Sequence, residues 1–239
     1  MNSIAITDLK KKFKNKIALK NISLNFSKKN ITGLLGPNGS GKTTLFNIIT
    51  GFLDADEGRI MIDELDITSY SLDRRSKLGL TYLPQEASIF RDLSVYDNIL
   101  SVAELFYSKK EKFLKVDQLI EDFSLTEFIE RKGKFLSGGE RRRTEIARAL
   151  ACDPSFIMMD EPFAGIDPIA IEEVRSTILK LKKNNIGVII TDHNVREALK
   201  IVDYAHIIYN GEIIREGAPR NIVNDELVKS IYLGKDYEE

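Results

Sequence analysis

Residues 36–43 are the part of this sequence best suited to chemistry. They read Gly-Pro-Asn-Gly-Ser-Gly-Lys-Thr and match the phosphate-loop pattern G-x-x-x-x-G-K-[ST] in full. Glycines let the backbone curl around an anion, and the N–H groups at the start of the next helix face the phosphates. Lys42 supplies a mobile positive charge, and Thr43 offers a hydroxyl to Mg²⁺. We therefore predict a nucleoside triphosphate site formed by Gly36, Pro37, Asn38, Gly39, Ser40, Gly41, Lys42, Thr43 and Thr44.

The sequence on both sides of this loop provides the setting that the motif requires. The apolar run Ile31–Leu35 predicts a buried strand that leads into the loop. Thr44–Thr50 predicts a helix that leads out of it, with Gly51 just past the helix end. An ordinary glycine-rich turn with an exposed lysine would not need this strand–loop–helix order, so the phosphate-binding interpretation is preferred.

Two acids follow a second apolar run. Phe156–Met159 predicts a buried parallel strand, and Asp160, Glu161 and Pro162 come directly after it. The carboxyl ends of such strands form the ligand crevice of open α/β sheets. Asp160 would then hold Mg²⁺, and Glu161 would orient or deprotonate the attacking water. Alone, the acids could equally be a solvated pair, but beside a complete phosphate loop we predict a catalytic carboxylate.

A second glycine turn, Ser137-Gly138-Gly139, precedes a helical pattern over Glu140–Ala151. A helix that starts at such a turn can bind an anion through its N–H groups. The same residues also fit an ordinary helix start, with Ser137 as the N-cap and Glu140 completing a capping box. The two interpretations are compatible, and the sequence leaves both open.

The composition restricts the class of protein. The 239 residues carry a net charge of −1, so no basic field indicates a nucleic-acid partner. A single cysteine, Cys152, excludes an internal disulfide and fits a reducing compartment. No apolar stretch is long enough to cross a bilayer, and the N-terminus lacks a signal-peptide pattern. We expect a cytoplasmic protein whose membrane role, if any, requires a partner.

The order of periodic segments predicts an α/β fold. Ile4–Phe13 and Ile17–Phe26 predict an antiparallel hairpin at the edge of the sheet, and Asn210-Gly211 predicts a second hairpin. Helical periodicity begins near Val95 and continues to Ile129. Further strands, alternating with helices, are predicted at Glu57–Ile62, Leu78–Pro84, Gly187–Thr191 and Tyr204–Asn210.

The sequence resembles ATP-binding cassette (ABC) ATPases over nearly its whole length. The resemblance rests on Leu136-Ser137-Gly138-Gly139-Glu140 followed by a strand that ends in Asp160-Glu161-Pro162. It implies a P-loop NTPase core with a mostly parallel sheet, an N-terminal antiparallel β subdomain and an inserted helical subdomain. Within one cassette domain over 1–239, residues 1–86 and 154–239 would form the core and β subdomain, and residues 87–153 the helical one.

The same resemblance implies further site residues and a partner. Gln85 would ligate Mg²⁺, His193 would touch the γ-phosphate, and Phe13 would stack on adenine. Asp167 would line the seam of a head-to-tail homodimer, in which Ser137, Gly138 and Gly139 complete the other chain's ATP site. On residue type alone, His193 and Phe13 would more often be structural, and Gln85 a surface side chain.

A narrower resemblance is to the ATPases of lipopolysaccharide export systems. It rests on the segments 82–98, 138–143, 160–165, 190–197 and 228–234. It implies extraction of lipopolysaccharide at the cytoplasmic face of the inner membrane, with two LptF/LptG-like integral membrane subunits docked in a groove whose apolar floor includes Phe90. The main alternative is the ATPase of another transporter, such as a branched-chain amino acid importer. A soluble switch cassette of translation or DNA repair and a small P-loop kinase fit less well.

Overall fold

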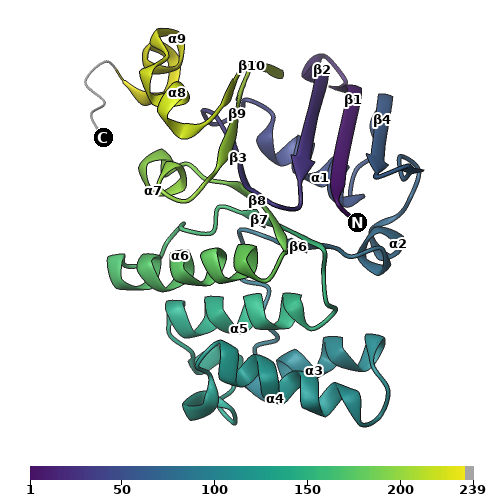
Figure 1. Cartoon of the computed structure of the whole chain (residues 1–239), viewed down its shortest axis with the longest axis vertical. Helices are drawn as coiled ribbons and strands as arrows, with labels where there is room; N and C mark the ends of the chain where they lie inside the picture. The colour runs from purple at the N-terminus through teal and green to yellow at the C-terminus, as the bar shows by residue number, and fades with distance from the viewer. Residues whose placement is uncertain (235–239) are drawn as a thin grey trace.

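The computed structural model describes residues 1–234 of the chain. It contains two sheets with helix α1 (Lys42–Thr50) packed between them and helices α3–α6, within residues 95–183, on the other side of the larger sheet (Figure 1). The larger sheet has six strands in the order β10-β9-β3-β8-β7-β6. All neighbours pair in parallel except β10, which is antiparallel to β9. The strands are β3 (Ile31–Leu35), β6 (Leu80–Leu83), β7 (Phe156–Asp160), β8 (Gly187–Thr191), β9 (Tyr204–Tyr209) and β10 (Glu212–Gly217).

Every residue of β3, β7 and β8 is buried, as expected for parallel strands that are covered on both faces. These strands run the same way, so the residues that follow them meet at one edge of the sheet. The predicted hairpin at Asn210-Gly211 is confirmed: φ is 49° and 78° at its two central residues, as a tight hairpin turn requires.

The N-terminal hairpin also forms, and it confirms the antiparallel β subdomain that the family resemblance implies. Its predicted place at the edge of the main sheet is wrong. Its strands belong to a separate antiparallel sheet in the order β2-β1-β4-β5. The free edge of β1 pairs with β4, for example Ile4 with Ile62, and this pairing separates the hairpin from the large sheet. The strands are β1 (Ser3–Phe13), β2 (Lys16–Ser27), β4 (Glu57–Ile62) and β5 (Leu65–Asp66).

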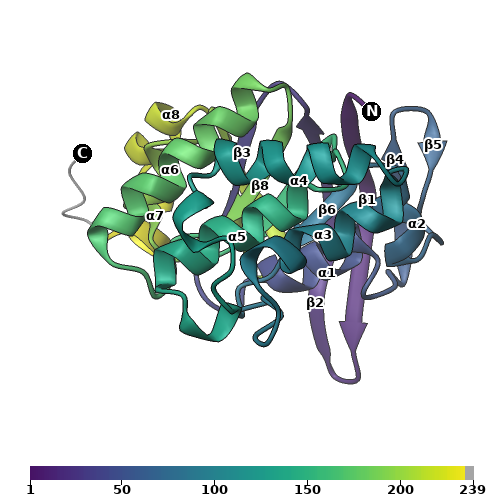
Figure 2. The same ribbon diagram turned by 90° about the horizontal axis from the view of Figure 1, so that it is seen from below.

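Four helices, α3 to α6, form a stack below the large sheet in the view of Figure 1. In Figure 1, α6 lies above α5, and α5 lies above α3 and α4; Figure 2 shows the α3–α5 group from below. The helices are α1 (Lys42–Thr50), α2 (Leu72–Lys77), α3 (Val95–Phe106), α4 (Glu111–Asp122), α5 (Gly138–Leu150), α6 (Pro168–Lys183), α7 (Val195–Leu199), α8 (Pro219–Asn224) and α9 (Glu226–Val228), with short 3₁₀ turns at Thr126–Phe128 and Gly133–Phe135 and a π turn at Lys229–Leu233.

Two apolar clusters fix these layers. One joins the large sheet to α3–α6, and the other lies between the antiparallel sheet and α1. Helix α1 contributes Leu45, Phe46 and Ile49 to the second cluster, so burial of one face of α1 positions the phosphate loop at its N-terminus. The helix begins at Lys42, two residues earlier than predicted, and ends at Thr50 as predicted. Gly51 follows as the C-cap, and its φ of 87° is the left-handed conformation typical of that position.

Candidate nucleotide site

The phosphate loop joins the end of β3 to the start of α1, in the strand–loop–helix setting that the sequence predicts. Two of its glycines are required by close approach of other backbone. A Cβ at Gly36 would lie 2.1 Å from the Ile208 carbonyl oxygen, and one at Gly41 would lie 2.9 Å from that of Ala18. Gly41 also has φ of 117°, which a larger residue resists. The loop is therefore wedged between β9 and β2.

Lys42 is folded back onto this loop and is only 6% exposed. Its Nζ donates hydrogen bonds to the carbonyl oxygens of Gly36 at 2.7 Å and Pro37 at 3.0 Å. Burial lowers the pKa of Lys42, while Glu161, Asp160 and Asp192 oppose that shift. A partly desolvated ammonium at the start of a helix is suited to bind phosphate oxygens.

Asp160 ends β7 and is nearly buried, at 5% exposure. Its Oδ1 accepts a hydrogen bond from the Thr191 hydroxyl, and its Oδ2 accepts one from the Tyr82 hydroxyl at 3.3 Å. Burial and the nearby Asp160 raise the pKa of Tyr82, which keeps this hydroxyl a donor. Both carboxylate oxygens are thus oriented by neighbours on β6 and β8, the strands that flank β7.

Glu161 is the point where three of the predicted site residues meet. Its Oε2 accepts a hydrogen bond from Gln85 Nε2 at 2.7 Å and lies 2.9 Å from Nδ1 of His193. Its φ of 47° is unusual for a residue with a Cβ, and its backbone N–H donates to the Thr191 carbonyl at 3.0 Å. Strained backbone of this kind clusters at functional sites. The arrangement presents one carboxylate between an amide and an imidazole.

Sequence reasoning missed the buried acid that supports this corner. Asp192 is fully buried and accepts hydrogen bonds from the N–H groups of Phe163 at 3.1 Å and Asn194 at 2.7 Å. The Phe163 bond ties the chain after β7 to the chain after β8, and the Asn194 bond closes the turn around His193. Burial is the main cause of the raised pKa of Asp192. The signal was available, because Asp192 directly precedes His193 at a predicted strand end.

The second glycine turn starts α5, and the predicted capping box is confirmed. Ser137 Oγ accepts from the Glu140 N–H, and the Glu140 side chain accepts from the Ser137 N–H. A Cβ added at Gly138 would lie 3.9 Å from Ile166 Cγ2, so this glycine is not tightly enclosed within its own chain. Asp167 caps α6 by accepting from Ile169 and Ala170. Within residues 1–234, no hydrogen bond joins either turn to the phosphate loop of the same chain.

Phe13 lies at the end of β1, opposite Lys16 in the tip of the hairpin, and is 44% exposed. Lys11 Nζ lies 5.6 Å from the centre of its ring. The other strand of this hairpin contributes Ala18, which backs onto Gly41 of the phosphate loop. The ring is therefore on an element that touches the predicted nucleotide site, although Phe13 itself is in no described contact with the loop.

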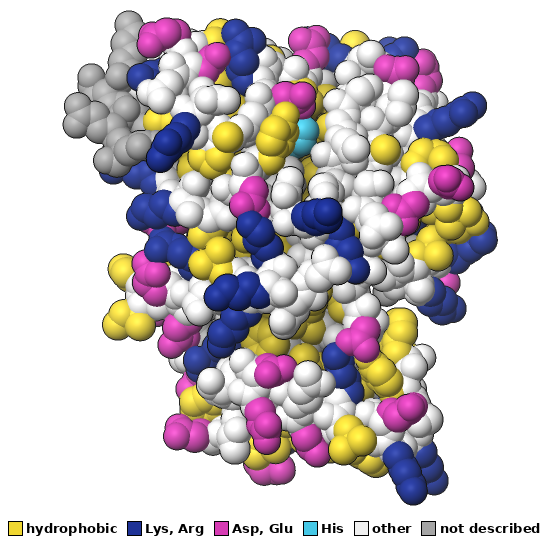
Figure 3. Space-filling model, in the orientation of Figure 1, with side chains coloured by type: hydrophobic (Ala, Val, Ile, Leu, Met, Phe, Trp, Pro, Cys, Tyr) yellow, Lys and Arg dark blue, Asp and Glu magenta, His cyan; other side chains and the backbone are white. Residues whose placement is uncertain are grey.

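An apolar groove of about 1000 Å³ separates the sheet core from the helical layer. Hydrophobic side chains are visible in the hollow between these two parts in Figure 3. Phe90 is not among the residues that line this groove, so its predicted place in the floor of a docking groove stays a prediction. Its half-exposed ring instead stacks on the guanidinium of Arg148, which does line the groove. Other lining residues are Phe52, Leu72, Tyr82, Ser88, Leu105 and Phe106.

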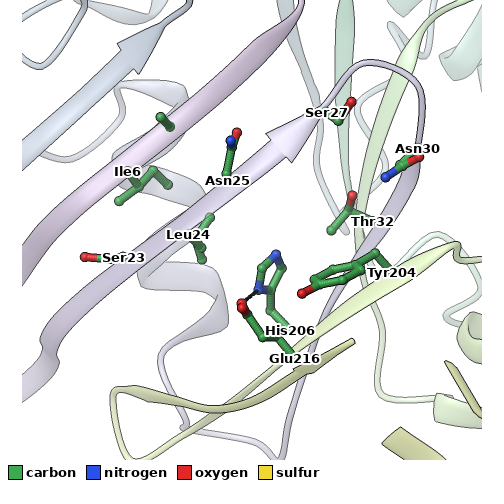
Figure 4. A pocket seen from close by; sticks show the side chains of 11 residues that line it. Ile6, Ser23, Leu24, Asn25, Ser27, Asn30, Thr32, Tyr204, His206 and Glu216 are labelled. Carbon is green, nitrogen blue, oxygen red and sulfur yellow. Dashed lines mark ion pairs between the residues drawn. The ribbon is translucent and has the colours of Figure 1, made fainter. Parts of the chain in front are cut away.

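A separate cavity of about 490 Å³ lies where β2 diverges from β9 and β10 (Figure 4). His206 forms the base of this cavity and is only 2% exposed. Its Nδ1 lies 2.9 Å from Glu216 Oε2, but the two atoms do not have hydrogen-bond geometry. The ring also makes edge contacts with Phe26 and Tyr204. His206 is thus a core histidine, as its sequence position suggests.

His206 makes stability depend on pH. Burial lowers its pKa below the usual value of about 6.5, and Glu216 only partly offsets this. Above pH 6.5 the ring is neutral in both the folded and unfolded states, so the stability is fully present. As the pH falls further, the unfolded chain takes up the proton first, and the free energy of unfolding decreases. We expect H206F to lose less stability than the unmodified chain between pH 7 and pH 5. Parallel urea titrations of both proteins that showed equal losses would contradict this.

Comparison with known proteins defines the class. Residues 19–164 match the family model described as ABC transporter. This range contains the phosphate loop, the Ser137 turn, Asp160 and Glu161. The chain belongs to the ATP-binding cassette family and is an ATPase. It is 45% identical, over 100% of both chains, to the lipopolysaccharide export system ATP-binding protein LptB of Haemophilus influenzae.

Two solved cassettes are also similar. The ADP conformation of MJ1267, an ATP-binding cassette of an ABC transporter, shares 32% identity with a TM-score of 0.87 and covers 98% of this chain and 100% of its own. The dimeric post-hydrolysis state of the cassette MJ0796, bound to ADP and phosphate, shares 26% identity with a TM-score of 0.80, covering 91% and 99%. The fold expected from the sequence is therefore confirmed. No helix within residues 1–234 is long and apolar enough to span a membrane.

Proposed function

We propose that this chain is the ATPase subunit of a transporter that extracts lipopolysaccharide from the inner membrane for export to the outer membrane. The observation that carries the proposal is the 45% identity to the Haemophilus influenzae LptB over the full length of both chains. The ATPase part follows from the family, whereas the transported substrate comes from the named relative alone. The importer alternative has no comparable support.

In this proposal the phosphate loop binds the triphosphate of ATP. The backbone of residues 36–41 surrounds the phosphates, and Lys42 exchanges its two carbonyl partners for phosphate oxygens. Thr44, in the first turn of α1, extends this contact, and Phe13 stacks on the adenine ring.

The residues near Asp160 also fit Mg²⁺. We propose Thr43, Gln85 and Asp160 as its protein ligands, because hydroxyl, amide and carboxylate oxygens are what this ion prefers. No group of three or more His, Cys, Asp or Glu side chains within residues 1–234 forms a metal site by itself. This fits an ion that is held mainly by substrate phosphates and water. Bound Mg²⁺ would neutralise charge on the phosphates.

Glu161 is proposed to act as the base that orients and deprotonates water, with His193 beside it to contact the γ-phosphate. The 2.7 Å and 2.9 Å contacts of Glu161 Oε2 with Gln85 and His193 define where the carboxylate points. The Asp192 hydrogen bonds hold the His193 segment against the segment after β7. The Glu161 carboxylate and the His193 imidazole therefore lie side by side at the end of β7.

We further propose a head-to-tail homodimer. The Ser137-Gly138-Gly139 turn presents the N-terminus of α5 but does not contact the phosphate loop of its own chain, so a second chain is needed to use it. Asp167 would line the seam between the chains. The similar cassette MJ0796 is dimeric in its post-hydrolysis state, which supports dimerisation of this chain. ATP would favour the closed dimer only through contacts that its γ-phosphate makes in that state.

The groove is proposed to receive coupling helices of two LptF/LptG-like membrane subunits, which would place the chain on the cytoplasmic face of the inner membrane. Its apolar lining suits the nonpolar face of a helix. We keep the division into residues 87–153 and the remaining core as part of the proposal, with the groove lying between them. Phe90 would contribute through its stacking on Arg148.

The substitution L105E tests the groove. Leu105 lines it and is 78% exposed, so a glutamate there should fold normally but place a charge against the apolar helix face. We expect co-purification with the membrane subunits from detergent extracts to fall about tenfold or more, with ATPase activity of the isolated chain unchanged. L114E, at an equally exposed leucine outside the groove, is the control. Undiminished co-purification of L105E would contradict the groove assignment.

The proposed substrate is tested by reconstitution. The chain is isolated with whatever membrane subunits accompany it, placed in proteoliposomes that contain lipopolysaccharide, and supplied with ATP. We expect ATP-dependent release of lipopolysaccharide to a soluble acceptor, and none with branched-chain amino acids as the cargo. Amino acid transport by the same preparation would establish the alternative.

A further inference from the structure

Three side chains on successive turns of α5 hold the loop that carries Gln85. Arg142 Nη1 donates a hydrogen bond to the Pro84 carbonyl oxygen at 3.2 Å, on one side of Gln85. On the other side, Glu145 Oε1 accepts from the N–H groups of Ser88 at 2.8 Å and Ile89 at 3.2 Å. Arg148 Nη2, one turn further along α5, donates to Ser88 Oγ at 2.7 Å. We call Arg142, Glu145 and Arg148 the loop clamp.

The clamp is buried, although it consists of charged residues. Arg142 is 7% exposed and Glu145 is 2% exposed, and Arg142 Nη1 lies 3.3 Å from Glu145 Oε2. Burial lowers the pKa of Arg142, and the Glu145 charge opposes that shift. A buried ion pair is favourable only in good geometry with further hydrogen bonds, so it fixes one arrangement of the groups around it. Here the further hydrogen bonds all go to the Gln85 loop.

The chain just after this loop is also held by other contacts, because Ile89 is buried and Asn98 hydrogen-bonds the backbone N–H and carbonyl of Phe90 at 2.8 Å and 3.0 Å. Between residues 84 and 88, the described hydrogen bonds are those of the clamp and the one from Gln85 to Glu161. Residues 85–87, between the two anchored ends, are exposed. A cavity of about 40 Å³, lined by Gln85, Arg142, Glu145 and Glu161 among others, lies where packing would otherwise support the loop. Gln85 nevertheless places Nε2 2.7 Å from Glu161 Oε2. The clamp contacts at residues 84 and 88 are thus the described hydrogen bonds that flank Gln85 on its two sides.

We propose that Glu145 is a positioning residue for ATP hydrolysis. It acts through the loop clamp, which holds Gln85 against Glu161, and it does not itself touch the reacting groups. Because α5 also begins at the Ser137 turn, about 12 Å along the helix from Glu145, the clamp makes the Gln85 loop and that turn move as one body. The inference rests on the roles proposed above for Gln85 and Glu161, whereas the attachment of the loop is measurable without them.

The test compares E145A with E145Q. In E145A the acceptor for two backbone N–H groups is lost. We expect hydrogen exchange at the Ser88 and Ile89 amides to accelerate roughly tenfold, and kcat to fall about 10- to 100-fold because the loop is misplaced. The Kd for ATP should stay within twofold, since the phosphate loop is untouched. E145Q keeps a carbonyl acceptor but leaves the Arg142 charge unpaired, so it should be less stable than the unmodified protein yet retain amide protection and most of kcat.

Several outcomes would overturn the proposal. If kcat in the two variants followed Tm and not amide protection, Glu145 would be only structural. If the Ser88 and Ile89 amides of the unmodified protein exchanged as fast as those of residues 86 and 87, the clamp would not hold the loop, and no variant is needed for that measurement. The control is E173Q, which breaks the Arg143–Glu173 ion pair on another side of α5 and should change neither exchange nor kcat. The E161Q variant tests the proposed role of Glu161 in hydrolysis, whereas amide exchange at Ser88 and Ile89 tests the clamp, so the two proposals can fail separately.

Discussion

Replacing Glu161 by glutamine is expected to reduce ATP turnover by about 10²- to 10⁴-fold while leaving ATP binding nearly intact. The glutamine oxygen can still accept a hydrogen bond from Gln85 or His193, so the corner of the site keeps its shape. What is lost is the negative charge that takes a proton from water. Phosphate release gives the turnover, and titration calorimetry with Mg-ATP gives the affinity.

The same variant also tests the shared site. With hydrolysis blocked, the triphosphate should hold two chains together, so light scattering of E161Q with Mg-ATP should report a dimer. E64Q, in the exposed turn after β4, is the matched control and should behave like the unmodified chain. Near-normal hydrolysis by E161Q would remove Glu161 from its proposed role. A solitary monomer saturated with Mg-ATP would contradict the head-to-tail arrangement.

Replacing Lys42 by alanine should weaken ATP binding itself, by about 10- to 100-fold, because a charge-assisted contact to phosphate is worth about 1.5–3 kcal/mol. Lys42 is buried at the start of α1, so its ammonium is partly shielded from water and its contact with phosphate should be stronger than that of an exposed lysine. Hydrolysis should fall in parallel at low ATP concentration. Equilibrium dialysis measures the affinity directly.

The control for Lys42 is K29A, at an exposed lysine in the turn between β2 and β3, where the same change in net charge should leave the affinity unchanged. K42M separates the charge from the packing of the alkyl chain and should bind as weakly as K42A. An unchanged Kd for both Lys42 variants would show that the phosphate loop does not bind the triphosphate as proposed. Restored affinity in K42M alone would mean that packing, not charge, matters.

The local features were predictable because contiguous residues encode them. Residues 36–43, the capping box at Ser137 and Glu140, and the Asn210-Gly211 turn each depend on backbone geometry over a few positions. The error appeared where distant pairing decides the outcome. The N-terminal hairpin joined β4 in its own sheet and not the edge of the large sheet.

The sequence by itself thus determined the phosphate loop, the acidic strand end and the family, since these are patterns of residue type and spacing. Only the tertiary structure decided that Gln85 and His193 converge on Glu161, and that Asp192 and Glu145 support them from inside the protein. The reason is that strand order and helix packing bring these residues together. Such long-range contacts depend on burial of the whole core, and no short stretch of sequence specifies them.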